Sequence, residues 1–461
     1  MEEGKLKREI SVPHGVLLLI GTVIGASAFI LIGPLAKETG PGLWLAYVLG
    51  AIPALFIAMV FAQLGTAFPM TGATYISVGR LVSPLASFLM VWILVLAIFL
   101  FAMPLMAGGF AIYFMQLLPL GGMSPDMKDI LLGILALLCL IFFTVLNTFE
   151  IKWMIWFQSI SVAIAIIALL VFGIGGLIFG NPANVIPMFP KGFWAVIVAI
   201  VPAYVMYTGV NAITEMGGET KEPRKSIPRI LLVSLVLLVI IYCAISYAIV
   251  ALLPYQTLTE GSVTEAAAKF LDPTFALVFM AIGAVLAAVT TVNGGIAFLS
   301  RDIMALARNH VLPAGLGRVS KKFNTPSRAV ILAGAMSVLG LVLLVVIGMK
   351  NVVRIASVFS QGFMLMSLLA CVAMLLLPSR IPERYQAASF KLKGFWLYFF
   401  TIGGIIIFGS LILIGWFQDP FSALVFGILV VTGLVYYYSR RWFLRRMNVS
   451  FEEGLVRIEE E

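Results

Sequence analysis

Charged residues are scarce in this chain of 461 residues, because Asp, Glu, Lys and Arg make up 11% of it while 62% of the residues are hydrophobic. A soluble globular protein has only about 45–50% apolar residues. The composition therefore excludes that class and indicates a membrane protein with many spans. Cysteine is also rare, and Cys139, Cys243 and Cys371 all lie inside apolar runs. Such placement is typical of small core residues and argues against a disulfide framework.

Histidine is rarer still, and the two histidines, His14 and His310, lie at the borders of apolar runs. No cluster of His, Cys and carboxylate residues has the spacing of a metal site, and no nucleophile with a base stands at membrane depth. We therefore expect no enzyme and no cofactor apart from a coupling Na⁺ or H⁺. The net charge of +9 does not indicate a nucleic acid partner, because the basic residues lie in loops where they set membrane orientation. A channel would need a filter-like ring or repeated subunits, and the sequence has no such pattern.

Apolar runs dominate what is present. A span of a hydrocarbon core about 30 Å thick takes about 20 helical residues. Twelve runs reach that length, near residues 13–37, 43–67, 84–116, 129–149, 153–179, 194–217, 230–253, 274–308, 329–348, 353–377, 395–417 and 420–443. They predict an all-α polytopic membrane protein with twelve transmembrane helices and no soluble domain.

Basic residues give the orientation. With an even number of spans both termini lie on one side, and that side would hold 24 Lys and Arg against 6 on the other. Lys and Arg concentrate in cytoplasmic loops. We therefore predict a multi-pass plasma membrane protein whose ends, residues 1–12 and 444–461, are both cytoplasmic.

Two of the runs are interrupted by small or polar residues, one within residues 16–29 and the other within residues 203–218. A helix that loosens there leaves backbone N–H and C=O groups unpaired at membrane depth, which is tolerated only where they line a cavity or bind a ligand. Two broken helices in corresponding positions of two halves indicate a secondary transporter.

Several separated motifs resemble, in order, those of the amino acid, polyamine and organocation (APC) superfamily of permeases. They are Gly21-x-x-Ile24-Gly25-x-Ser27-x-Phe29, residues 62–75, Met206-Tyr-Thr-Gly-Val210 followed by Glu219-Thr-Lys-Glu-Pro-Arg224, and Ala305-Leu-Ala-Arg308 with Leu312-Pro313. The resemblance implies the LeuT-type fold. This fold has a 5+5 inverted repeat, here residues 13–179 and 194–377, with helices 1 and 6 broken and two extra helices in residues 395–443.

The resemblance also implies a substrate site at the bilayer midplane between helices 1, 3, 6 and 8. Backbone N–H groups at a helix N-terminus suit a carboxylate, and carbonyls freed in helix 6 suit an ammonium, so together they describe an α-amino acid. The expected site comprises Ile24, Gly25, Ala26, Ser27, Ala28, Val205, Met206, Tyr207, Thr208, Gly209 and Gly295. We expect Tyr204, Asn211 and Glu215 to act in gating or coupling. For Tyr204 and Tyr207 the alternative is ordinary aromatic packing.

The chain departs from many proton-linked relatives at two points. They carry an acidic residue where Asn211 stands, and some carry a lysine in helix 5 where residues 161–166 are apolar. A proton carrier needs a group that titrates at membrane depth. Glu215 is the only carboxylate near the sixth-helix site, and it has either a salt-bridge or capping role or a proton role.

Helix 8 offers a sodium site instead. Ala287-Ala-Val-Thr-Thr291 has the spacing of the second sodium site in LeuT-type symporters, and the resemblance places the five oxygens on Gly21, Ile24, Ala287, Thr290 and Thr291. Neutral oxygens suit a hard cation. The alternative is that each threonine bonds a carbonyl of its own helix.

The middle of helices 1, 3, 6, 8 and 10 carries no unpaired charge, and a buried charge on a substrate would need a partner. We therefore predict a transporter of a neutral, apolar amino acid in the lipid bilayer, with sodium symport favoured. A proton symporter, an amino acid exchanger and a non-transporting receptor are the alternatives.

Overall fold

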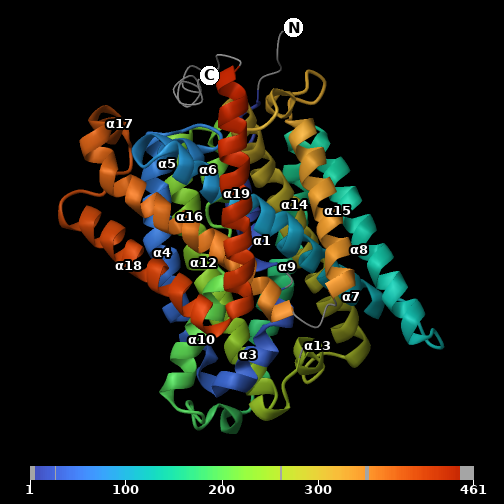
Figure 1. The fold of residues 1–461 in the computed structure, drawn as a ribbon. Coiled ribbons are helices and arrows are strands. Elements are labelled where there is room, and N and C mark those ends of the chain that lie inside the picture. Colours follow the sequence, from blue (N-terminus) through green and yellow to red (C-terminus); the bar gives the residue numbers. More distant parts are fainter. Residues whose placement is uncertain (1–5, 26, 260–261, 348–351, 447–461) are drawn as a thin grey trace.

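The computed structural model describes residues 6–25, 27–259, 262–347 and 352–446, and within these ranges the chain is helical with no strand (Figure 1). Ten of its helices are long and apolar enough to cross a membrane. The helices that form these spans are α4 (Leu43–Ala67), α6 (Pro84–Ala97) continued by η2 (Ile98–Ala102) and α7 (Met103–Gln116), α8 (Pro125–Thr148), α9 (Ile151–Phe179), α12 (Pro223–Leu252), α14 (Pro273–Arg308), α15 (Ser327–Ile347), α16 (Val352–Arg380), α18 (Phe395–Gln418) and α19 (Pro420–Arg446).

The two runs predicted to be interrupted are broken in the structure. The first consists of α1 (Val12–Ile24), α2 (Ser27–Ile30) and α3 (Ile32–Thr39), and the second of α10 (Phe193–Val205) and α11 (Ala212–Glu215). Each break contains a glycine with positive φ, Gly25 at +52° and Gly209 at +98°. Because L-residues with a Cβ rarely adopt these conformations, the glycines explain why the helices end where they do.

Short helices make the connections. They are α5 (Ala73–Leu81), α13 (Ser262–Ala267), α17 (Pro382–Ala387), η1 (Gly40–Gly42), η3 (Pro182–Val185), η4 (Gly217–Glu219), η5 (Tyr255–Thr257) and η6 (Ala314–Gly317). In Figure 1 the last residues of α19 lie at the top, while α13 and α3 lie at the opposite end of the molecule. The connection between α12 and α14, which carries α13, therefore lies at the opposite end of the bundle from the end of α19.

Helix α14 lies at the centre of the bundle, where it packs against α1, α7, α8, α9, α11 and α15. From Ala287 to Ala307 nearly all of its side chains are buried. Large apolar side chains point outward from α8, α9, α18 and α19, among them Trp153, Trp156 and Phe417. An apolar outer surface of this kind is that of a helical bundle surrounded by lipid.

Candidate functional site

A cavity of about 80 Å³ lies between the two helix breaks, and we call it the central cavity. One water molecule needs about 10–15 Å³ on this scale, so the cavity has room for several atoms of a small ligand. Its lining consists of Thr22, Val23, Gly25, Leu31, Ile98, Ala102, Met103, Leu105, Met106, Thr208, Gly209, Thr291, Gly295, Phe298, Phe359 and Phe363. Parts of the chain far apart in sequence thus meet at one site.

The lining is apolar apart from main-chain groups and three threonines. Of these, Thr22 donates its hydroxyl to the Leu18 carbonyl at 2.8 Å, while Thr208 and Thr291 contribute further hydroxyls. None of the residues that line the cavity has an ionisable side chain. A charged side chain on a ligand would find no counter-ion here.

Four of the predicted substrate residues line the central cavity: Gly25, Thr208, Gly209 and Gly295. Ile24, Ala28, Met206 and Tyr207 are buried but are not part of the lining. Ala26 lies outside the described residues, and of Ser27 and Val205 only the helical backbone is described. The wall formed by Met103, Met106, Phe298, Phe359 and Phe363 was mostly not predicted, because an apolar residue in an apolar helix gives no signal in the sequence.

The tyrosines beside the second break are packed. The Tyr242 hydroxyl donates to the Met206 carbonyl at 2.8 Å, and the Tyr207 hydroxyl donates to the Tyr47 carbonyl at 3.0 Å. Tyr204 packs on Phe408, with 5.7 Å between ring centroids. A role of Tyr204 in gating stays a prediction. The Met206 carbonyl thus accepts a hydrogen bond from within the protein.

Four of the five predicted sodium ligands meet between α1 and α14. The Thr291 hydroxyl lies 3.0 Å from the Gly21 carbonyl and 3.4 Å from the Ala287 carbonyl, and the Thr290 hydroxyl donates to Ala287 at 2.9 Å. Ile24, the fifth, is the last residue of α1 before the break. Both threonines thus also make the hydrogen bonds within their own helix that the alternative interpretation requires.

Comparison with known proteins gives the family. The sequence model described as "Amino acid permease" matches residues 11–437. This chain belongs to the amino acid permease family. Its relatives include the methylthioribose transporter of Bacillus subtilis, 26% identical over 448 residues that cover 95% of this chain and 94% of the relative.

Two further relatives of this permease are named for branched-chain amino acids. The branched-chain amino acid permease BcaP of Bacillus subtilis is 27% identical over 456 residues, covering 95% of this chain and 94% of the relative. The protein of the same name in Lactococcus lactis is 24% identical over 443 residues, covering 91% of each chain. The chain is thus a membrane transporter rather than an enzyme, and the predicted membership of the APC superfamily is confirmed.

A buried amide chain crosses the permease behind the threonines. Asn147 of α8 donates to the Asn293 side chain at 2.8 Å, and Asn293 donates to Gln158 of α9 at 2.8 Å. Gln158 in turn donates to the Thr290 carbonyl at 3.0 Å. Sequence reasoning missed this network, although three amides within apolar runs were a signal for it.

Glu215 and Asn211, for which a role in gating or coupling is predicted, are both buried. A Glu215 carboxylate oxygen accepts the Thr74 backbone N–H at 3.3 Å, so Glu215 caps the N-terminus of α5. This contact is of the capping kind, no salt bridge to Glu215 exists among the described residues, and the choice between a capping and a proton role stays a prediction. The Asn211 amide reaches the Met366 sulfur at 3.6 Å.

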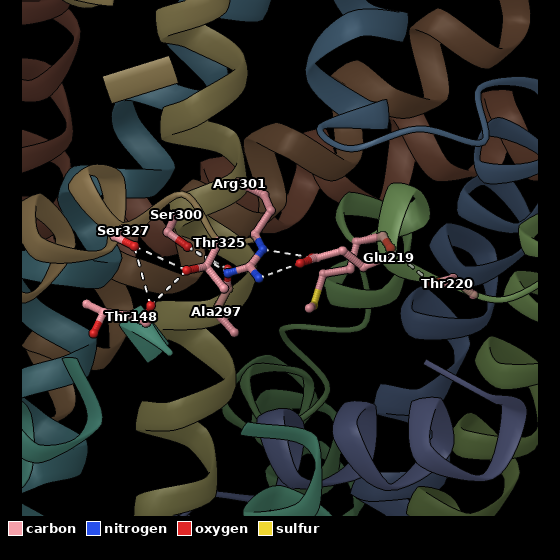
Figure 2. A network of polar contacts seen from close by, with 9 residues as sticks. Thr148, Glu219, Thr220, Ala297, Ser300, Arg301, Thr325 and Ser327 are labelled. Atoms are coloured by element: carbon pink, nitrogen blue, oxygen red, sulfur yellow. Dashed lines mark hydrogen bonds and ion pairs between the residues drawn. The ribbon is translucent and has the colours of Figure 1, made fainter. Parts of the chain in front are cut away.

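A buried ion pair that the sequence did not predict joins the end of the second broken helix to α14. Figure 2 shows the Arg301 guanidinium facing Glu219, with two nitrogen–oxygen distances of 2.8 and 2.7 Å. Arg301 also donates to the Ala297 carbonyl at 2.8 Å and to Ser300 at 3.1 Å. On the other side the Ile10 N–H donates to the Glu219 carbonyl at 3.0 Å. The N-terminal segment, the second broken helix and α14 are thus linked at one end of the bundle.

Proposed function

We propose that this permease carries a neutral, apolar amino acid across the membrane by alternating access, with the substrate in the central cavity. The observation that carries the proposal is the placing of this uncharged cavity between two helix breaks, each with a positive-φ glycine. Freed main-chain groups at the breaks can bind a carboxylate and an ammonium. The apolar walls then select the side chain, and the relatives named as branched-chain amino acid permeases have substrates of this kind.

The proposed layout has twelve spans in a 5+5 inverted repeat, residues 13–179 and 194–377, followed by two further spans in residues 395–443. Ten continuous spans and two broken ones support this layout. Both termini are proposed to be cytoplasmic, in the plasma membrane. The excess of Lys and Arg in the loops on their side supports that orientation.

Sodium is the proposed coupling ion, held by the carbonyls of Gly21, Ile24 and Ala287 and the hydroxyls of Thr290 and Thr291. These oxygens come from α1 and α14, so a cation bound to them would stabilise the contact between the first broken helix and the central helix. Ion-independent exchange is the second candidate. It is favoured by the hydrogen bond from Thr291 to Gly21, which joins the same two helices without an ion.

Thermal unfolding of the purified permease with a panel of neutral amino acids, in sodium and in choline at equal ionic strength, tests the proposal. A ligand that binds only the native state raises stability by RT ln(1 + [L]/Kd). Stabilisation by an apolar amino acid in sodium alone is expected. Equal stabilisation in both salts would contradict the sodium site but not the proposed transport of an apolar amino acid. Stabilisation by charged amino acids alone would contradict the proposed substrate class.

A further inference from the structure

Two buried carboxyl groups face each other where the second broken helix meets α14. Glu215 ends α11 and is 1% exposed, and Asp302 lies on α14 and is 2% exposed. The two carboxyl groups lie within interaction range of each other, on helices that pack together. One hydrogen bond between two carboxyl groups needs one proton, because an ionised carboxylate can only accept.

The surroundings of the pair supply acceptors rather than positive charge. Among the described residues, Glu215 Oε1, Asp302 Oδ1 and Asn211 Oδ1 are buried and have no hydrogen-bond donor. The Asn211 side chain reaches Glu215. The Thr74 N–H, 3.3 Å from the other Glu215 oxygen, is the one main-chain donor to the pair. Buried acceptors without donors are rare in folded proteins. The side chains of Thr74 and Asn211 are neutral donors beside Glu215, but among the described residues Asp302 has no side-chain partner apart from Glu215. A hydrogen between these two groups therefore has to come from the pair itself.

No cation in the described part of the chain contacts the pair. On the helices packed against it, Arg301 is bound to Glu219, Arg308 donates to the Gly317 carbonyl, and the Tyr75 hydroxyl accepts from Asn309. The other charged or titratable groups there contact neither carboxyl: His14 on α1, Arg80 on α5, and Arg224, Lys225 and Arg229 on α12. Two adjacent carboxylates that are both buried and both ionised would repel each other strongly.

A metal ion fits the pair less well than a proton. Carboxyl groups in direct contact leave no space between them for an ion with its own ligand shell. In addition, no group of three or more His, Cys, Asp or Glu side chains within the described ranges could hold a metal. The pair resembles instead the carboxyl dyads in which two side chains share one proton.

The position of the pair gives the proton a mechanical role. The Gly72 N–H donates to the Glu215 carbonyl at 3.1 Å, so α11 and the start of α5 are tied through the main chain. Asp302 stands on the helix that carries Thr291 and Gly295 of the central cavity. The contact between Glu215 and Asp302 therefore joins α11, a four-residue helix, to the helix that forms one wall of the central cavity.

We propose that Glu215 and Asp302 form a proton-binding site whose single shared proton fastens α11 to α14 and keeps the cytoplasmic side of the permease closed. This rests on the alternating access and the orientation proposed above. When the proton leaves to water at that side, both carboxylates are ionised and repel, and α11 separates from α14. The neighbouring Glu219–Arg301 pair does not respond in this way, because arginine stays protonated.

The sign of the pH effect follows. If opening releases one proton, the ratio of open to closed permease rises about tenfold for each unit by which pH increases. Glu215→Gln keeps an acceptor for the Thr74 N–H and adds a donor toward Asp302. It therefore imitates the protonated site, and Asp302→Asn does the same from the other side.

Infrared difference spectroscopy of the purified permease tests whether the proton is there. The wild type should show the C=O band of a protonated carboxylic acid, and this band should vanish as pH rises. The band should be missing in both Glu215→Gln and Asp302→Asn. Glu383→Gln, an exposed acid on α17, should keep the band. An identical band in all four proteins would overturn the proposal, and so would a band that disappears when sodium replaces choline at constant pH.

Thiol labelling tests the latch. Ala305→Cys lies one turn beyond Asp302 and is buried against Gly72; it is introduced with the three native cysteines changed to alanine. Because the thiolate is the species that reacts, labelling by a charged reagent rises about tenfold per pH unit below the thiol pKa even without a latch. In this background the rate should rise about a hundredfold per pH unit, and only about tenfold per unit when Glu215→Gln is added. Labelling that follows pH equally with and without Glu215→Gln would overturn the latch. Neither experiment uses an amino acid, so a failure here is separate from a failure of the transport proposal.

Discussion

The hydroxyl of Thr291 on α14 lies 3.0 Å from the carbonyl of Gly21 on α1, and this contact closes a loop of 270 residues in sequence. Thr291 also lines the central cavity. One side chain thus touches the proposed substrate site and the proposed ion site together. Binding at one site would therefore affect the other by the same free energy in both directions.

Removing the hydroxyls tests the ion site. Thr290→Val and Thr291→Val each lose one proposed oxygen ligand, so the stabilisation given by a bound amino acid should become equal in sodium and choline. Melting without ligand should change little, because one hydrogen bond contributes about 1 kcal/mol. Sodium dependence that persists in both variants would contradict the assignment of these threonines.

Alanine at the two break glycines should have unequal effects. In Gly25→Ala the new Cβ would stand 2.8 Å from the Thr291 hydroxyl, in a backbone conformation that costs a residue other than glycine about 1–3 kcal/mol. In Gly209→Ala the nearest atom is 3.5 Å away, so only the backbone cost applies. Substrate binding should therefore be weaker in Gly25→Ala than in Gly209→Ala, as measured by calorimetry; equal affinities would show that contact with Thr291 is unimportant.

Gly295→Ala should change selectivity rather than folding. The added Cβ would approach the terminal methyl of Met103 to 2.7 Å, and that flexible side chain can shift. The central cavity becomes smaller, so affinity for a large apolar amino acid should fall about tenfold or more relative to alanine, since one methylene in an apolar pocket changes binding by about 1–3 kcal/mol. Competition assays with leucine and alanine measure the ratio, and an unchanged ratio would place the substrate elsewhere.

The buried pair of Glu219 and Arg301 should matter mainly for stability. Arg301→Met leaves the Glu219 carboxylate buried without a partner, and breaking a buried pair typically costs about 3–5 kcal/mol. The double variant Glu219→Leu/Arg301→Met removes both charges and should recover much of the lost melting temperature. A double variant as unstable as the single one would mean that the hydrogen bonds to Ala297 and Ser300 dominate.

The helix breaks could be predicted because their cause is local. Small residues in an apolar run, here Gly25 and Gly209, show where a backbone can leave the helix without a Cβ clash. The meeting of Gly21 with Thr291 followed only from resemblance to a family, since periodicity does not say which faces of distant helices touch.

The parts that could not be predicted depend on such distant contacts. Asp302 falls near the end of the apolar run 274–308, and its partner Glu215 precedes it by many residues along the chain. Phe359 and Phe363 wall the cavity, yet their sequence context is like that of any apolar helix. Gln158 lies about one turn before residues 161–166, and a lone amide in an apolar run does not show that it faces Asn293 and Thr290 of a distant helix. In each case the packing of three or more helices fixed the role of the residue.

Uptake into proteoliposomes is the measurement that tests the central claim most directly. Purified permease is reconstituted, radiolabelled L-leucine, L-isoleucine, L-valine or L-phenylalanine is added outside, and accumulation is compared with empty liposomes and with Gly25→Ala. The account predicts saturable uptake of at least one of these amino acids, dependent on a sodium gradient and lost in Gly25→Ala. Binding of an apolar amino acid without any uptake or exchange would contradict it and indicate a receptor with a permease fold.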